Sequence, residues 1–95
     1  MPAYVVVDVN VKNADRYEDY KKLGGPTVGQ FGGRYLARGG ATEVLEGIRT
    51  PGRFVILEFP DADRARAWWN SKEYAPAKEI RQEVADTEMV LVEGV

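Results

Sequence analysis

Valine residues recur at every second position near the start of the chain. Val5, Val7, Val9 and Val11 alternate with residues of mixed character that include Asp8. Successive side chains of a strand point to opposite faces, so this spacing places the valines together on one face. The pattern predicts a strand over residues 4–11 with one wholly apolar side.

Beyond this strand, helical and strand-like patterns alternate. A first helix is predicted over residues 14–23, capped by Asn13 and ended by the run Gly24-Gly25-Pro26. A second helix is predicted to be capped by Asp61 or Asp63, to be broken at residues 70–73, and to continue as a second helical piece from residue 74 or 76 to residue 84. Strands are predicted at 34–38, 42–46, 54–59 and 89–93, of which 54–59 is expected to be buried on both faces.

The order of these elements matches the split βαβ arrangement. It predicts a single α+β domain over residues 1–95, with a ferredoxin-like antiparallel sheet covered by two helices on one face. The other face has no partner within the chain and would be a large apolar patch if it were exposed. A domain of 95 residues also has little stability to spare. We therefore expect the chain to associate with a second copy as a homodimer.

The composition excludes several kinds of chemistry, because the chain contains no cysteine and no histidine. Disulfides, thiolate nucleophiles, Ser-His-Asp triads, His-ligated haem and nearly all zinc sites require one or the other. Acid–base chemistry must then come from Asp, Glu, Tyr or Lys, with Arg as a fixed cation.

The charge of the chain also limits its partners. The net charge of -2 is spread without long blocks of either sign, so neither nucleic acid nor an anionic membrane is an expected partner. The first residues lack the features of a signal peptide, and no apolar run approaches the roughly 20 residues that span a bilayer. We expect a soluble cytoplasmic protein.

Charged residues interrupt three of the predicted strands. Asp8 and Glu58 lie in otherwise apolar strands that are central neighbours in the split βαβ order. On the strand between the two glycine pairs, a period of two places Arg34 and Arg38 on one face and Tyr35 on the other. If the charged faces all point away from the helices, the two acids and the two arginines form one polar cluster.

Two interpretations of this cluster remain open. In the first, the cluster binds an anionic or polar metabolite, with Arg34 or Arg38 as a carboxylate clamp and Asp8 or Glu58 as a general base of raised pKa. In the second, the charges are ion pairs that set the register of a dimer. The pattern favours the second interpretation, and both can hold together.

Aromatic residues on or beside the predicted helices, and one on the arginine-bearing strand, form a second candidate site. Some of them could line a flat pocket for an aromatic substrate, with tyrosine hydroxyls as orienting groups. Helical spacing is also typical of core packing, which is the default interpretation. The residues are Tyr17, Tyr20, Tyr35, Trp68, Trp69 and Tyr74.

Other polar and flexible features are interpreted structurally. The glycine pairs 32–33 and 39–40 lack the spacing of a phosphate loop and are expected to provide positive φ angles and close approach of the chain. Ser71 has no histidine to activate it and is expected to cap a helix break. Asp8, Glu43, Glu46 or Glu58 could bind Mg²⁺ or Ca²⁺, but their spacing resembles no known ligand loop, and no metal is expected. No other cofactor is expected either.

Several segments together resemble the DUF1330 family of the dimeric α+β barrel superfamily, and the match covers essentially the whole chain. This resemblance implies a homodimer whose two sheets form a barrel, with a pocket between each sheet and its helices. The matching segments are AYVVVDVNV, the pair Tyr17-x-x-Tyr20, FGGRYLARGG, VLEG, FVILEFP, the A-x-x-W-W-N-S-x-E-Y stretch from Ala65 to Tyr74, and the closing LVEG.

The resemblance leaves two functions open, since the family name means unknown function. The wider superfamily includes cofactor-free monooxygenases, muconolactone isomerase-like enzymes, haem-degrading enzymes and EthD-like proteins. The first function is therefore a small-molecule binding protein or cofactor-free enzyme, monooxygenase- or isomerase-like, that acts on a small acidic or aromatic metabolite. The alternative is a non-catalytic homodimeric module whose charges only stabilise its interface. A pocket with incompletely paired charges would favour the first.

Overall fold

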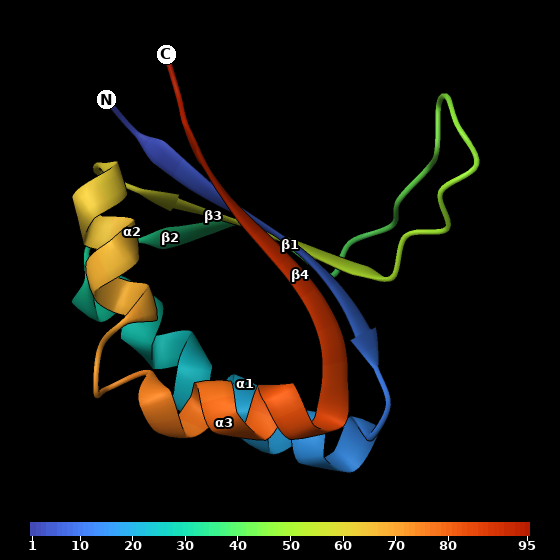
Figure 1. Ribbon diagram of the computed structural model, residues 1–95, viewed down its shortest axis with the longest axis horizontal. Coiled ribbons are helices and arrows are strands. Elements are labelled where there is room, and N and C mark those ends of the chain that lie inside the picture. Colours follow the sequence, from blue (N-terminus) through green and yellow to red (C-terminus); the bar gives the residue numbers. More distant parts are fainter.

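Four strands form one antiparallel sheet, and three helices lie against one of its faces (Figure 1). The structure is a computed structural model that describes residues 1–95. The strand order β2-β3-β1-β4 places β1 and β3 at the centre and confirms the ferredoxin-like split βαβ fold. Along the chain, the elements are β1 (Ala3–Val11), α1 (Ala14–Gln30), β2 (Arg34–Arg38), β3 (Arg53–Phe59), α2 (Ala62–Trp69), α3 (Ala75–Val84) and β4 (Ala85–Glu93).

The two faces of the sheet differ in burial. On the face under the helices, here called the covered face, Val5, Val7 and Val9 of β1 are at most 4% exposed, as the valine pattern predicts. The opposite face, here called the open face, carries residues that are only half-buried or exposed. It is defined by Tyr4, Val6, Asp8, Phe54, Ile56, Glu58, Glu88, Val90 and Val92.

Trp68 lies at the centre of the core, where it joins the helices to the sheet. Its ring is 2% exposed, 4.2 Å from the ring of Tyr74 and 5.5 Å from that of Phe59, measured between centroids. Its indole Nε1 donates a hydrogen bond to the hydroxyl of Thr27 on α1, over 3.0 Å. Core packing is therefore confirmed for Trp68 and Tyr74.

Helix α1 continues seven residues beyond its predicted end at residue 23, through Gly24, Gly25 and Pro26. An interior proline costs a helix about 3 kcal/mol, but the turn that follows it places Thr27 and Val28 in the core, at 4% and 2% exposure. Gly24 serves close packing, because a Cβ there would lie 3.3 Å from the Cβ of Ala77 on α3. The predicted helix end is wrong because tertiary burial outweighs the local signal.

The strand predicted over residues 42–46 is also wrong. Residues 40–52 form a loop that projects from the sheet on the side away from the helices (Figure 1, green to yellow). In the sheet, β3 lies between β2 and β1, so a further strand in this segment would have no free neighbour beside β3. Two other predicted details change in the structure: β4 begins at Ala85, and β3 is fully buried only on its covered face.

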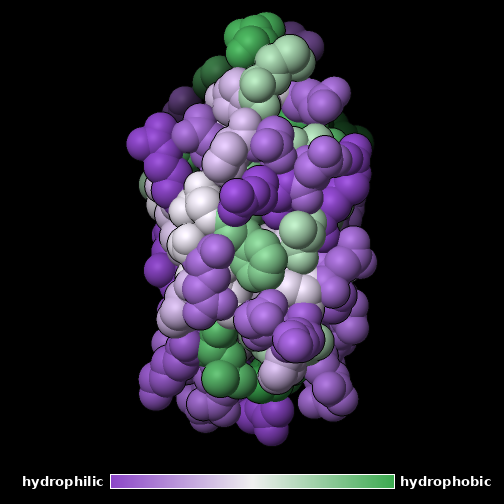
Figure 2. Space-filling view, turned by 90° about the vertical axis from the view of Figure 1, so that its left-hand side faces the viewer, coloured by the Kyte–Doolittle hydropathy of each residue, from purple (hydrophilic) through white to green (hydrophobic).

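The solvent-facing side of the helix layer has a different character from the core. Seen from the side that carries α2 (Figure 2), the surface is mainly hydrophilic and its hydrophobic areas are small. None of the three helices combines the length and apolar character needed to cross a bilayer.

The core position of Trp68 gives a first testable prediction. Replacing it by alanine removes the ring and its hydrogen bond to Thr27, so the free energy of unfolding should fall by about 3–5 kcal/mol in urea titrations. Leu45→Ala, at a loop residue that is 89% exposed, is the control and should change it by less than about 0.5 kcal/mol. A near-neutral Trp68→Ala variant would contradict the core assignment.

Candidate functional site

A bulge at Leu36 decides where the side chains of β2 point. The partners across β3 are Arg34↔Glu58 and Tyr35↔Leu57 before the bulge, and Ala37↔Ile56 and Arg38↔Val55 after it. The extra residue reverses the alternation of faces. Arg34 therefore lies on the open face, whereas Arg38 joins Tyr35 on the covered face. The prediction that the two arginines share a face, with Tyr35 on the other, is wrong for this reason.

The predicted polar cluster does not assemble, because its members form separate pairs. On the open face, Glu58 accepts a hydrogen bond from Arg34 over 2.7 Å. Asp8 accepts one from Arg49 of the projecting loop over 2.7 Å and one from the backbone N–H of Gly52 over 2.9 Å.

The two acids are also far apart. The register places Asp8 opposite Phe54, four residues from Glu58 along β3, which is about 14 Å of strand. Arg38 lies on the other face of the sheet. The proposed general-base roles of Asp8 and Glu58 stay predictions, while the completed ion pairs favour the structural interpretation.

The covered face carries a polar group that we call the arginine–tyrosine cluster. Its arginines come from β2, β3 and α3, and its tyrosines come from α1, from β2 and from the turn before α3. The cluster consists of Arg38, Arg53 and Arg81 with Tyr17, Tyr20, Tyr35 and Tyr74.

Two of these arginines lie over tyrosine rings. The guanidinium carbon of Arg38 is 4.3 Å from the centroid of Tyr35, and that of Arg53 is 5.7 Å from the centroid of Tyr17. Gly39, with φ of +71°, leaves room for the second of them, because a Cβ at this position would overlap the Arg53 guanidinium. The glycine after β2 thus shapes the site as well as the turn.

The third arginine is held from the helix layer. Arg81 is 4% exposed, and its Nε donates a long hydrogen bond of 3.4 Å to the hydroxyl of Tyr74. The same hydroxyl lies 2.9 Å from that of Tyr20. A chain of polar groups therefore runs from α3 to α1 above the sheet.

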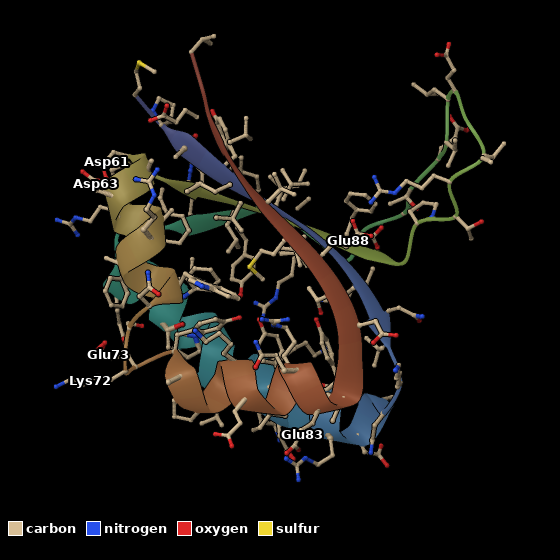
Figure 3. The ribbon with its side chains drawn as sticks, in the orientation of Figure 1. Asp61, Asp63, Lys72, Glu73, Glu83 and Glu88 are labelled. Carbon is tan, nitrogen blue, oxygen red and sulfur yellow. The ribbon has the colours of Figure 1, made fainter.

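No acidic side chain balances these cations. None of the protein's ion pairs includes Arg38, Arg53 or Arg81, and Nε of Arg53 and Nη2 of Arg81 are buried without a hydrogen-bond partner. Labelled acids of the helix layer point outward in Figure 3; they are Asp61, Asp63, Glu73 and Glu83. A buried donor without a partner is energetically unfavourable, so the cluster is suited to an added anion.

Burial raises the pKa of three tyrosines of the cluster. It raises the pKa of Tyr20, and the neighbouring Tyr74 raises this pKa further. Burial also raises the pKa of Tyr17 and of Tyr35, although the charges of Arg53 and Arg38, respectively, oppose it. At physiological pH, Tyr17, Tyr20 and Tyr35 therefore offer neutral hydroxyls beside the arginines.

A small cavity of about 30 Å³ lies within the cluster, close to the size of one water molecule. Tyr17, Tyr35, Arg38 and Trp68, which the sequence indicates as ligand-binding residues, line this cavity together with Arg53. No Asp or Glu lines it. The cavity thus presents cations and hydroxyls, but it contains no carboxylate that could act as a base.

Sequence reasoning missed two members of the cluster. Arg53 has the same strand parity as the buried residues Val55 and Leu57, so its side chain belongs to the covered face. Arg81 is four residues after Ala77 and three before Val84, both of which are buried. Charged residues at these apolar positions were the available signal.

Two other expectations concern single groups and metals. Ser71 donates its hydroxyl to the carbonyl of Trp68 over 2.8 Å and accepts from the N–H of Tyr74 over 3.1 Å, which confirms that it caps the helix break. No three acidic residues come together in an arrangement that could hold a metal ion.

A family comparison agrees with this fold over nearly the whole chain. The family model described as "Domain of unknown function (DUF1330)" matches residues 2–95. The chain belongs to the DUF1330 family. The resemblance seen in the sequence is thus confirmed. No curated protein matches this DUF1330 chain.

Solved structures with the same fold are distant in sequence from this DUF1330 protein. A protein of unknown function from Rhodopseudomonas palustris is 19% identical, with a TM-score of 0.80 over 99% of this chain and 82% of its own. A dimeric ferredoxin-like protein of unknown function from Jannaschia sp. is 14% identical, with a TM-score of 0.73 over 99% of this chain and 100% of its own. SnoaB, a cofactor-independent oxygenase from Streptomyces nogalater, is 12% identical, with a TM-score of 0.69 over 99% of this chain and 93% of its own. At these identities the likeness shows the fold alone.

The unpaired state of Arg81 gives a second prediction. Arg81→Met removes a buried donor that has no partner, so the free energy of unfolding should rise by about 1–3 kcal/mol in urea titrations. Lys78→Met is the control on the same helix. It removes an ammonium that donates to the carbonyl of Trp69 over 2.9 Å, so it should not stabilise the protein. If Arg81→Met instead lowers the free energy of unfolding, Arg81 stabilises the fold and the prediction is wrong.

Proposed function

We propose that this DUF1330 protein binds a small anionic metabolite, acidic or aromatic, between its sheet and its helices. The observation that carries this proposal is the arginine–tyrosine cluster, in which three arginines have no acidic partner. A carboxylate or phenolate would accept the unused N–H groups of Arg53 and Arg81. The neutral tyrosine hydroxyls would orient it.

The same groups would also assist a reaction. Arginine N–H groups and tyrosine hydroxyls stabilise negative charge that develops on a substrate oxygen, as in an enolate or phenolate. The fold is shared with SnoaB, which is named a cofactor-independent oxygenase. We therefore propose a cofactor-free monooxygenase- or isomerase-type reaction as the class to test, with Arg38, Arg53 and Arg81 as the anion-stabilising groups.

The open face supports a second part of the proposal, namely homodimerisation. Its apolar residues include Val90 and Val92, which are 59% and 48% exposed in the single chain. Covering such a face with a second copy removes apolar surface from water. The fold is shared with a protein described as dimeric. We assign Asp8, Glu58 and Arg34 to this interface, as ion pairs that set its register.

One observation favours a purely structural function instead. On the open face, Asp8 and Glu58 each have a cationic partner, as expected of a module whose charges only stabilise an interface.

Ligand binding distinguishes the two proposed functions. A thermal-shift screen of small carboxylates and phenols, with mass followed by light scattering, tests both. A ligand at a hundred times its Kd should stabilise the fold by about 2.7 kcal/mol. A dimer that none of them stabilises would favour the structural module.

Opposite faces of β2 provide a matched pair of variants. Arg38→Ala removes a cation of the proposed site, so it should weaken binding of a ligand found in the screen by roughly tenfold or more, as measured by calorimetry. Arg34→Ala removes a cation from the open face of the same strand and should leave the ligand affinity unchanged. If the two variants change the ligand affinity equally, Arg38 does not belong to the binding site.

A charge on the open face should disrupt the proposed dimer. Val90→Asp would bury a carboxylate without a partner, and light scattering should show a shift from dimer to monomer at micromolar concentration. Leu23→Asp, at a similarly exposed position on α1, is the control and should leave the mass unchanged. A Val90→Asp protein that stays dimeric would place the interface elsewhere.

A further inference from the structure

An apolar groove of about 210 Å³ lies between α2 and the edge strand β4. All but one of its lining residues are hydrophobic. They are Val5, Ala65, Trp68, Trp69, Met89 and Leu91, with Arg66 as the exception. An apolar cavity of about 150 Å³ is large enough to bind benzene. The groove therefore has room for one aromatic ring with a short substituent.

Met89 connects this groove to the polar groups of the covered face. Its side chain lines the groove, the small cavity beside Arg38 and Arg53, and a third hollow that is also lined by Arg81 and Thr87. Methionine is unbranched and adapts its shape easily. The apolar groove and the two polar hollows adjoin at this one residue.

The third hollow offers donors for an anion. Arg81 is 4% exposed and its Nη2 has no hydrogen-bond partner; the hydroxyl of Thr87 is also buried without one. The acidic residue that lines this hollow, Asp86, already pairs with Lys12 over 3.1 Å. One nitrogen of a charged guanidinium and a hydroxyl are thus without a partner in the hollow that adjoins the apolar groove at Trp69 and Met89.

We propose that the ligand is a single-ring aryl carboxylic acid. Its ring lies in the groove against Trp69 and Met89, which line both the groove and the third hollow, and its carboxylate accepts hydrogen bonds from Arg81 and Thr87. This inference rests on the proposed function, because it specifies which anion the covered face receives. It adds a requirement that the arginines alone do not impose, namely an apolar body attached to the acid.

Three small probes separate the two parts of the site. Isothermal titration of the full chain is made with phenylacetate, acetate and benzyl alcohol. Burial of a phenyl group predicts that phenylacetate binds roughly ten- to a hundredfold more tightly than acetate. Loss of the charged end predicts that benzyl alcohol binds at least roughly tenfold more weakly than phenylacetate.

A filled groove provides the matching variant. Leu91→Trp places a large ring in the groove without removing a cation, so phenylacetate affinity should fall roughly tenfold or more while acetate affinity stays the same. Leu23→Trp makes the same substitution on α1, where the residue is 49% exposed, and should change neither affinity. Leu91→Phe is a smaller filler that gives the same test if the tryptophan variant does not fold.

The outcomes distinguish this inference from the proposed function. Equal affinity for acetate and phenylacetate, with no effect of filling the groove, would overturn the aryl-acid inference and leave the anion site standing. Benzyl alcohol binding as tightly as phenylacetate would also overturn it, because the groove would then act without the arginines. If Leu91→Trp changes the oligomeric state of the protein and leaves its affinity for phenylacetate unchanged, the groove is an interface between copies and the aryl-acid inference is overturned. Failure of every acid to bind would overturn both.

Discussion

One extra residue in β2 determines which face of the sheet receives Arg38. Because strand side chains alternate, the bulge at Leu36 shifts every later position of β2 to the opposite face. Without it, Arg38 would lie beside Arg34, among the ion pairs of the open face. With it, Arg38 stacks on Tyr35 and reaches the space under the helices. The composition of the candidate site depends on this local irregularity.

The charges of the protein are divided between the two faces of the sheet. On the open face, Asp8 and Glu58 each have an arginine partner, whereas the covered face holds three arginines and no acid to balance them. The free energy of unfolding of a small domain is only about 5–15 kcal/mol, so buried donors without partners lower it by a substantial fraction. The proposed anion would supply hydrogen-bond acceptors for the donors of Arg53 and Arg81 that lack them.

Trp68 belongs to both the core and the candidate site. Trp68 packs against Phe59 and Tyr74, donates to Thr27, and also lines both the small cavity and the apolar groove. The continuation of α1 past Pro26 provides that Thr27 contact. The part of α1 that the sequence did not predict therefore supplies the hydrogen bond that positions Trp68 in the wall of the pocket.

The sequence by itself determined the split βαβ fold, the valine face of β1 and the caps at Asn13 and Ser71, because these follow from periodicity and local hydrogen bonding. It also indicated the family, through the resemblance of several separate segments. Tertiary structure alone decided the course of α1 through Pro26, the loop in place of a strand at 42–46, and the face of Arg38. Each of these depends on contacts between distant segments. A strand's side-chain alternation can be read from its sequence only while its register is unbroken, and the bulge in β2 is visible only in its pairing with β3.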